Sequence, residues 1–90
     1  MSQHVHIQYN DQFLSQMDEV QSDDTVEHVG RIIGQLQAFP DMGNPRPRQT
    51  LRNRYGEDIR TMPVEHYLLV YKHDDEVLKI IALVWAASIK

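Results

Sequence analysis

The pattern that most constrains the fold lies near the C-terminal end of the chain, in the stretch HYLLVYKHDDEVLKIIALVW. Residues 66–72 and 77–85 are rich in Tyr, Val, Ile and Leu, which favour strands, and the polar HDDE between them is typical of a turn. This arrangement predicts a β-hairpin. The second strand is apolar on both faces apart from Lys79, so we expect a central strand that is covered on both sides.

The N-terminal part of the chain predicts one strand followed by two helices. The segment HVHIQYN alternates apolar and polar residues, which is the period of a strand. Apolar residues then recur at helical spacing over residues 11–21 and again over about 24–38, where Pro40 ends the second helix. Gly30 and Gly34 each weaken this second helix by about 1 kcal/mol relative to alanine, a cost that is tolerable if the helix packs closely on a neighbour.

The middle of the chain predicts a loop and then strand segments. DMGNPRPR contains glycine, asparagine and two prolines, which are loop residues. RQTLRNR follows, with Thr50 and Leu51 as strand-compatible residues. DIRTMPV alternates in the manner of a strand, and Pro63 within it indicates a sheet edge, a strand end or a bulge.

The order of predicted elements is β-α-α-β-β-β, which indicates an α+β fold. We expect one domain over residues 1–90, with two N-terminal helices packed on one face of a mostly antiparallel four-stranded sheet. The chain has no cysteine, which excludes disulfides and thiolate zinc sites. The N-terminus lacks the pattern of a signal peptide, and the longest apolar run, IIALVWAA, is far shorter than a membrane span. We therefore expect a cytoplasmic protein with no membrane partner.

Positive charge is concentrated in one segment of a chain whose formal net charge is −4. Four of the nine Lys and Arg residues fall within NPRPRQTLRNR, residues 44–54, and Arg60 follows. One interpretation is an exposed loop that pairs with the acidic helices. The other is an anion-binding rim for phosphates or for an acidic partner segment, for which Arg52, Arg54 and Arg60, on or beside strands, are the candidates.

The segment IRTMPVEHYLLVYKHDDE, within a longer match from FPDMGNPRPR to IALVW, resembles the C-terminal half of the RelE/ParE superfamily of bacterial toxins. The N-terminal half is similar in its layout of strand, helix and helix. The resemblance implies the toxin of a type II toxin–antitoxin module, whose growth inhibition is neutralised by a cognate antitoxin. It also implies one of two targets: RelE-like toxins cut messenger RNA in the ribosome, whereas ParE-like toxins inhibit DNA gyrase and are not nucleases.

The resemblance also implies which residues would cut RNA. RelE-like toxins carry a basic residue inside the segment that reads HYLLVY here, where this chain has Leu68, and another after the last strand, where this chain reads WAASIK. Arg60 remains as the candidate catalytic cation, and His66 is a weaker candidate base, as is His73.

These departures leave three interpretations open. The first is a toxin of ParE-like or divergent RelE-like character that acts by binding. The second is a ribosome-dependent endoribonuclease with a shifted basic site. The third is a decayed member that binds only an antitoxin.

No metal or cofactor is expected. His4 and His6 share one face of the first predicted strand, but no third ligand is suggested nearby. Trp85 near the end of the last strand is expected in the core or at an interface rather than as a platform for base stacking. The sequence leaves the oligomeric state open.

Overall fold

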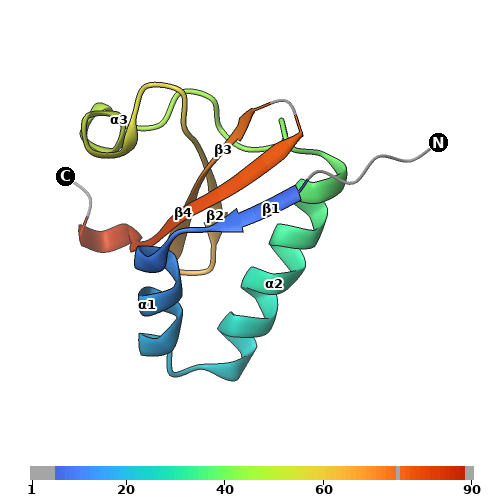
Figure 1. Ribbon diagram of the computed structural model, residues 1–90. Coiled ribbons are helices and arrows are strands. Elements are labelled where there is room, and N and C mark those ends of the chain that lie inside the picture. The colour runs from blue at the N-terminus through green and yellow to red at the C-terminus, as the bar shows by residue number, and fades with distance from the viewer. Residues whose placement is uncertain (1–5, 75, 89–90) are drawn as a thin grey trace.

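A four-stranded sheet with the order β1-β4-β3-β2 is the frame of the computed structural model, which describes residues 6–74 and 76–88 (Figure 1). Its strands are β1 (His6–Tyr9), β2 (Arg60–Val64), β3 (Tyr67–Asp74) and β4 (Val77–Trp85). β1 runs parallel to β4, and the β2–β3 and β3–β4 pairs are antiparallel. The predicted hairpin and the mostly antiparallel sheet are therefore confirmed.

Helices cover both faces of this sheet (Figure 1). α1 (Asp11–Glu19) and α2 (Asp23–Ala38) lie on one face, as predicted, and Ser22 caps α2 by accepting a hydrogen bond from the Thr25 N–H. A third helix, α3 (Gln49–Tyr55), lies on the other face. A short 3₁₀ helix, η1 (Ala86–Ser88), follows β4.

The larger core lies between the sheet and the first two helices. Phe13 of α1 and the apolar stripe of α2 bury their side chains there against β2, β3 and β4. Its fully or nearly fully buried members are Phe13, Val29, Ile33, Leu36, Val64, Leu69, Tyr71, Leu78, Ile80 and Leu83. The helical spacing of the α2 residues and the alternation along β3 are the sequence patterns that produce this layer.

A smaller core lies on the opposite face, under α3, and a β-bulge helps to build it. Val70 pairs with Ala82 and Tyr71 pairs with Ile80, so Ile81 is an extra residue on β4. Because of this bulge, Ile81 and Ala82 both belong to the cluster under α3. β4 is thus a central strand that is apolar on both faces, as the sequence predicts.

The expectation that residues 49–54 are compatible with a strand is wrong, because this segment forms α3. Leu51 and Tyr55 lie four residues apart, on one side of the helix, and both pack into the smaller core. The Gln49 side chain donates a hydrogen bond to Asn53 at 2.8 Å, which also supports one helical turn. Gly56 ends the helix with a φ of 121°, a conformation that favours glycine.

α2 packs on the sheet through its apolar stripe, but Gly30 and Gly34 are not part of that contact. Both residues are exposed on α2, and a Cβ atom added at either position would meet nothing within 4 Å. Glycine at these positions therefore lowers helix stability without a packing requirement in this structure.

Replacing Gly30 or Gly34 with alanine is expected to raise the free energy of unfolding by about 1 kcal/mol each, because alanine restricts the unfolded chain and favours the helix. Urea denaturation of the single and double variants measures this gain. Gly43→Ala is the matched control, because its Cβ would lie 2.9 Å from the Thr61 carbonyl oxygen and would clash with the Tyr71 hydroxyl. Stabilisation by Gly43→Ala, or loss of stability in both α2 variants, would contradict this account.

The turn between β2 and β3 is tied to α2 through Glu65. Thr25 Oγ1 donates a hydrogen bond to Glu65 Oε1 at 2.7 Å, and His28 Nδ1 lies 3.2 Å from Glu65 Oε2. The bond from Thr25, and then the bond from His28, lower the pKa of Glu65 below its ordinary value of 4.5. Glu65 has a φ of 56°, so these bonds hold a strained residue in place.

Because the pKa of Glu65 is lowered on folding, its charge stabilises the protein above about pH 4.5, and this contribution is lost as the pH falls through the folded value. Glu65→Gln is therefore expected to be less stable than the wild type at pH 6, with the difference shrinking below pH 4.5. Chemical denaturation of both proteins across this range measures the effect. A difference that stays constant with pH would show that the charge of Glu65 has no role.

Candidate functional site

Two of the three candidate catalytic residues, Arg60 and His66, lie at opposite ends of β2. Arg60 begins the strand, where it pairs with Tyr71, and His66 follows the end of the strand. Four residue steps along β2 correspond to about 13 Å. The structure therefore does not bring Arg60 and His66 into one site.

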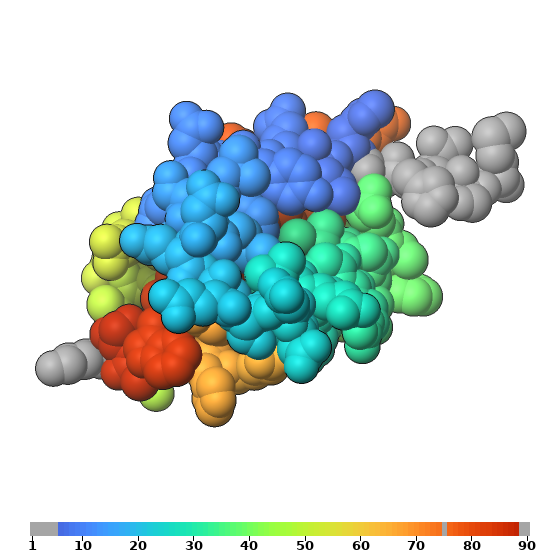
Figure 2. Space-filling view, turned by 90° about the horizontal axis from the view of Figure 1, so that it is seen from below, coloured from blue at the N-terminus to red at the C-terminus, as the bar shows by residue number. Residues whose placement is uncertain are grey.

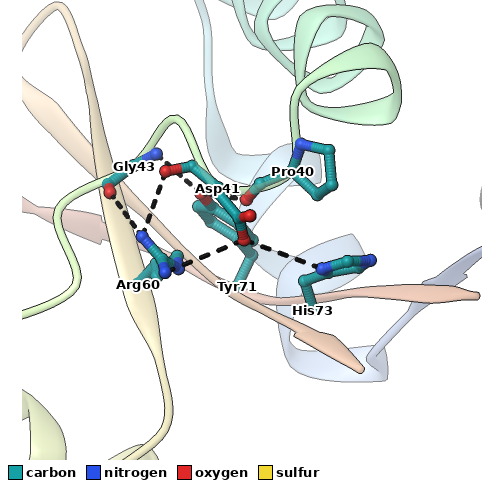
Figure 3. A network of polar contacts seen from close by, with 6 residues as sticks. All are labelled: Pro40, Asp41, Gly43, Arg60, Tyr71 and His73. Atoms are coloured by element: carbon teal, nitrogen blue, oxygen red, sulfur yellow. Dashed lines mark hydrogen bonds and ion pairs between the residues drawn. The ribbon is translucent and has the colours of Figure 1, made fainter. Parts of the chain in front are cut away.

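Arg60 binds the loop that follows α2 (Figure 3). Its Nη1 donates hydrogen bonds to the main-chain carbonyl oxygens of Asp41, at 3.0 Å, and Gly43, at 3.1 Å. Its Nη2 lies 3.7 Å from the Asp41 carboxylate. The guanidinium group thus fixes the loop to the start of β2.

Tyr71 binds the same loop from the neighbouring strand (Figure 3). Its buried hydroxyl donates a hydrogen bond to the Pro40 carbonyl oxygen and accepts one from the Gly43 N–H, both at 2.9 Å. Burial raises the pKa of Tyr71 above its ordinary value of 10.0, while the hydrogen bond from Gly43 acts in the opposite direction. His73, the second candidate base from the sequence, lies at the rim of this network, with Nδ1 3.9 Å from the Asp41 carboxylate.

A pocket of about 310 Å³ lies at the other end of the sheet, where α1, α3 and the end of β4 meet. Its walls include one acidic, one basic and three aromatic side chains: Glu19, Arg54, Tyr55, Tyr67 and Trp85. The Arg54 guanidinium lies 5.7 Å from the centre of the Tyr55 ring, within the range of a cation–π contact. We call this the Trp85 pocket.

Trp85 is the most exposed aromatic wall of the Trp85 pocket, with 47% of its surface accessible. The Tyr67 ring meets it edge-on at a centroid distance of 5.2 Å, and the His66 ring lies 5.6 Å away. Trp85 is therefore not a core residue, and its role at an interface stays a prediction. His66 is exposed, and its ring lies beside the ring of Trp85.

Comparison with known protein families identifies the chain. The family model described as "ParE toxin of type II toxin-antitoxin system, parDE" matches residues 7–88. The chain belongs to the ParE toxin family. It is the toxin of a type II toxin–antitoxin module, as the sequence resemblance implies, and membership of this family implies an antitoxin partner.

The fold of this ParE toxin is similar to a solved structure titled "Chromosomal ParDE TA system from P. aeruginosa". The TM-score is 0.69 at 12% sequence identity, and the match covers 93% of this chain and 98% of the other. At this identity the likeness concerns the fold. A search of curated proteins gave no match.

The three arginines predicted as one anion-binding rim are distributed over different parts of this ParE toxin. Arg52 donates a hydrogen bond to Gln49 at 2.8 Å, and its Nη1 lies 3.6 Å from the Glu57 carboxylate. Arg54 lines the Trp85 pocket, whereas Arg60 binds the loop at the opposite end of the sheet. Arg54 thus lines the Trp85 pocket, and Arg52 and Arg60 do not.

Sequence reasoning did not identify the acidic wall of the Trp85 pocket. Glu19 ends α1 directly after Asp18, and the last turn of this helix has no basic residue. Negative charge is unfavourable at this end of a helix, because the helix dipole is also negative there. Two acidic residues at the C-terminal end of a predicted helix are therefore the feature of the sequence that could have pointed to this acidic wall.

No group of three or more metal-ligating side chains lies together within residues 6–74 and 76–88. His6 is exposed on β1, and His4 of the predicted pair lies outside the described residues. None of the helices in the described part of the chain is long and apolar enough to span a membrane.

Tyr71→Phe is expected to lower the free energy of unfolding by about 1–3 kcal/mol, because it leaves the Gly43 N–H and the Pro40 carbonyl without their partner. The pKa of Tyr71 is raised on folding, so its contribution is complete below about pH 10 and is lost as the pH rises through the folded value. The wild-type advantage should therefore narrow above pH 10 in urea denaturation. Tyr9→Phe, at an exposed ring, is the control. Equal stability of wild type and Tyr71→Phe at pH 8 would contradict the assignment.

Proposed function

We propose that this ParE toxin arrests bacterial growth by binding DNA gyrase, and that it does not cut RNA. The geometry of Arg60 is the observation that carries this proposal. Arg60 is the one cation that the chain keeps from the RelE-like pattern, and its Nη1 is already bonded to two main-chain carbonyl oxygens. We infer that Arg60 positions a loop instead of stabilising a reacting phosphate.

RNA cleavage through the 2′-hydroxyl requires a base, an acid and a cation around one phosphate. The candidate base His66 is separated from Arg60 by the length of β2. The second candidate, His73, lies closer, but its Nδ1 faces the Asp41 carboxylate and its Nε2 is buried. Tyr71, beside Arg60, is buried, and its raised pKa favours the neutral phenol. Leu68 packs against the smaller core, at the position where RelE-like toxins carry a basic residue. These placements support a toxin that acts by binding.

The proposal includes the partners and the compartment. We infer a cytoplasmic protein that meets either its antitoxin or its target. An antitoxin segment that folds on binding would neutralise the toxin in one of two ways. It would occupy the surface through which the toxin binds its target, or it would block the approach of the toxin to the target. The competition would make growth arrest depend on the ratio of toxin to antitoxin.

Tightly induced expression in a bacterium, followed by pulse labels for DNA and protein synthesis, tests this proposal. DNA synthesis is expected to fall first, and the purified toxin is expected to inhibit supercoiling by gyrase. Arg60→Lys is an informative variant, because it keeps the positive charge but loses the geometry of the guanidinium group. We expect it to lower thermal stability and to retain inhibition per folded molecule.

Two results would contradict the proposal. One is an early fall in protein synthesis with DNA synthesis intact. The other is unaffected growth and supercoiling in the presence of folded wild-type protein, as circular dichroism would establish.

A further inference from the structure

We propose that the Trp85 pocket receives a basic side chain of the target protein, with arginine as the best fit. This inference rests on the proposed function, because it locates the surface through which the toxin would bind its target. The residue types in the walls of the pocket, their charges and their hydrogen-bonding groups indicate that the pocket binds a protein.

The residue types in the pocket are those that dominate binding energy at protein interfaces. Trp, Tyr and Arg are enriched at such positions, and the pocket contains Trp85, Tyr67, Tyr55 and Arg54. Trp85 is about half exposed, although its large apolar ring gains from burial. A volume of about 310 Å³ is at the lower end for small-molecule sites, so it suits one long side chain with its adjoining backbone.

Charge favours a cation on the α1 side of the pocket. Glu19 lines the pocket and forms no ion pair with any residue of 6–74 or 76–88. The negative end of the α1 dipole points to the same place. Glu19 and the helix dipole thus make the α1 side of the pocket negative, and Arg54 makes the α3 side positive, so that a cation is favoured beside α1.

Two glutamines connect the walls of the pocket. Gln12 Nε2 donates to the Tyr55 hydroxyl at 3.1 Å, which joins α1 to α3. Gln16 Oε1 accepts from the Leu83 N–H at 2.6 Å, which joins α1 to β4. The carbonyl oxygen of Gln12 keeps its capacity to accept a bond from an incoming donor.

Arginine fits this set of groups better than lysine. Its planar guanidinium can stack on the exposed face of Trp85 while its N–H groups bond to Glu19 and Gln12. Arg54 lies across the pocket beside Tyr55 and would repel a second cation there. We therefore expect the partner to place a carboxylate or carbonyl oxygen close to its arginine, where it would meet Arg54.

Figure 2 shows the surface formed by the C-terminal segment beside α1, with α3 behind them at the same end of the molecule.

A nucleotide is a different occupant with some of the same requirements, since Arg54 could hold a phosphate and Trp85 could stack on a base. The Glu19 carboxylate, which lines the same pocket, disfavours a phosphate beside it.

Titration of gyrase supercoiling with purified full-length toxin variants tests the inference. Trp85→Ala and Glu19→Lys are each expected to require about 30-fold more toxin for half-inhibition, the loss typical of an interface hot spot. Phe39→Ala is the matched control, because this aromatic residue is 67% exposed at the end of α2 and lies outside the pocket. Inhibition by the wild type is expected to weaken as salt increases, and Glu19→Gln is expected to flatten this dependence.

The outcomes separate the inference from the proposed function. Wild-type inhibition with unchanged inhibition by folded Trp85→Ala and Glu19→Lys would overturn the inference and leave the function intact. If the wild type fails to inhibit gyrase, the function is wrong. In that case, growth arrest tests the inference about the pocket. If the wild type arrests growth and Trp85→Ala and Glu19→Lys do not, the pocket binds a basic side chain of another target. If both variants still arrest growth, the inference is overturned. The chain has one tryptophan, so quenching of its fluorescence by micromolar GMP or AMP would indicate a nucleotide and also overturn the inference.

Discussion

The burial of β4 on both faces is the constraint on which the rest of the structure depends. An apolar strand between β1 and β3 needs a layer of side chains above and below it. α1 and α2 supply one layer, and α3 supplies the other. The bulge at Ile81 adds apolar surface on the α3 side, so that even a seven-residue helix can complete the second core. The loop that leads to α3 must therefore cross the edge of the sheet, and Asn44 pairs with Thr61 of β2 where it does so.

This crossing explains the role of two polar side chains at this edge of the sheet. Arg60 and Tyr71 are cross-strand partners, and both bind the loop of residues 40–43. Buried main-chain groups require partners, and a loop that crosses a sheet edge has no regular ladder to supply all of them. Arg60, a catalytic candidate in the sequence, thus bonds to main-chain carbonyl oxygens of this loop in the fold. The side chains that line the Trp85 pocket, among them Trp85, Arg54 and Glu19, lie at the opposite end of the sheet.

The sequence predicted the elements whose signal is periodic and long. The hairpin, the central position of β4 and the two N-terminal helices follow from alternation and helical spacing. The edge position of Pro63 is one of the three positions that proline chemistry allowed. It did not predict α3, because seven residues with one turn of apolar spacing give little periodicity, and Thr50 and Leu51 suit either state. The candidate site was predicted only in part. Arg54 was identified as a partner-binding candidate, but Glu19 comes from α1, and only the tertiary structure brings these two side chains to one pocket.

A ParE toxin that acts by binding, with its arginine at β2 committed to a loop, should leave cellular RNA uncut. Sequencing of RNA 5′ ends after induction of the toxin tests this central claim most directly. The account predicts the same set of ends with and without induction while growth is arrested. New ends that accumulate inside coding regions, in step with codons and only when ribosomes translate them, would contradict it.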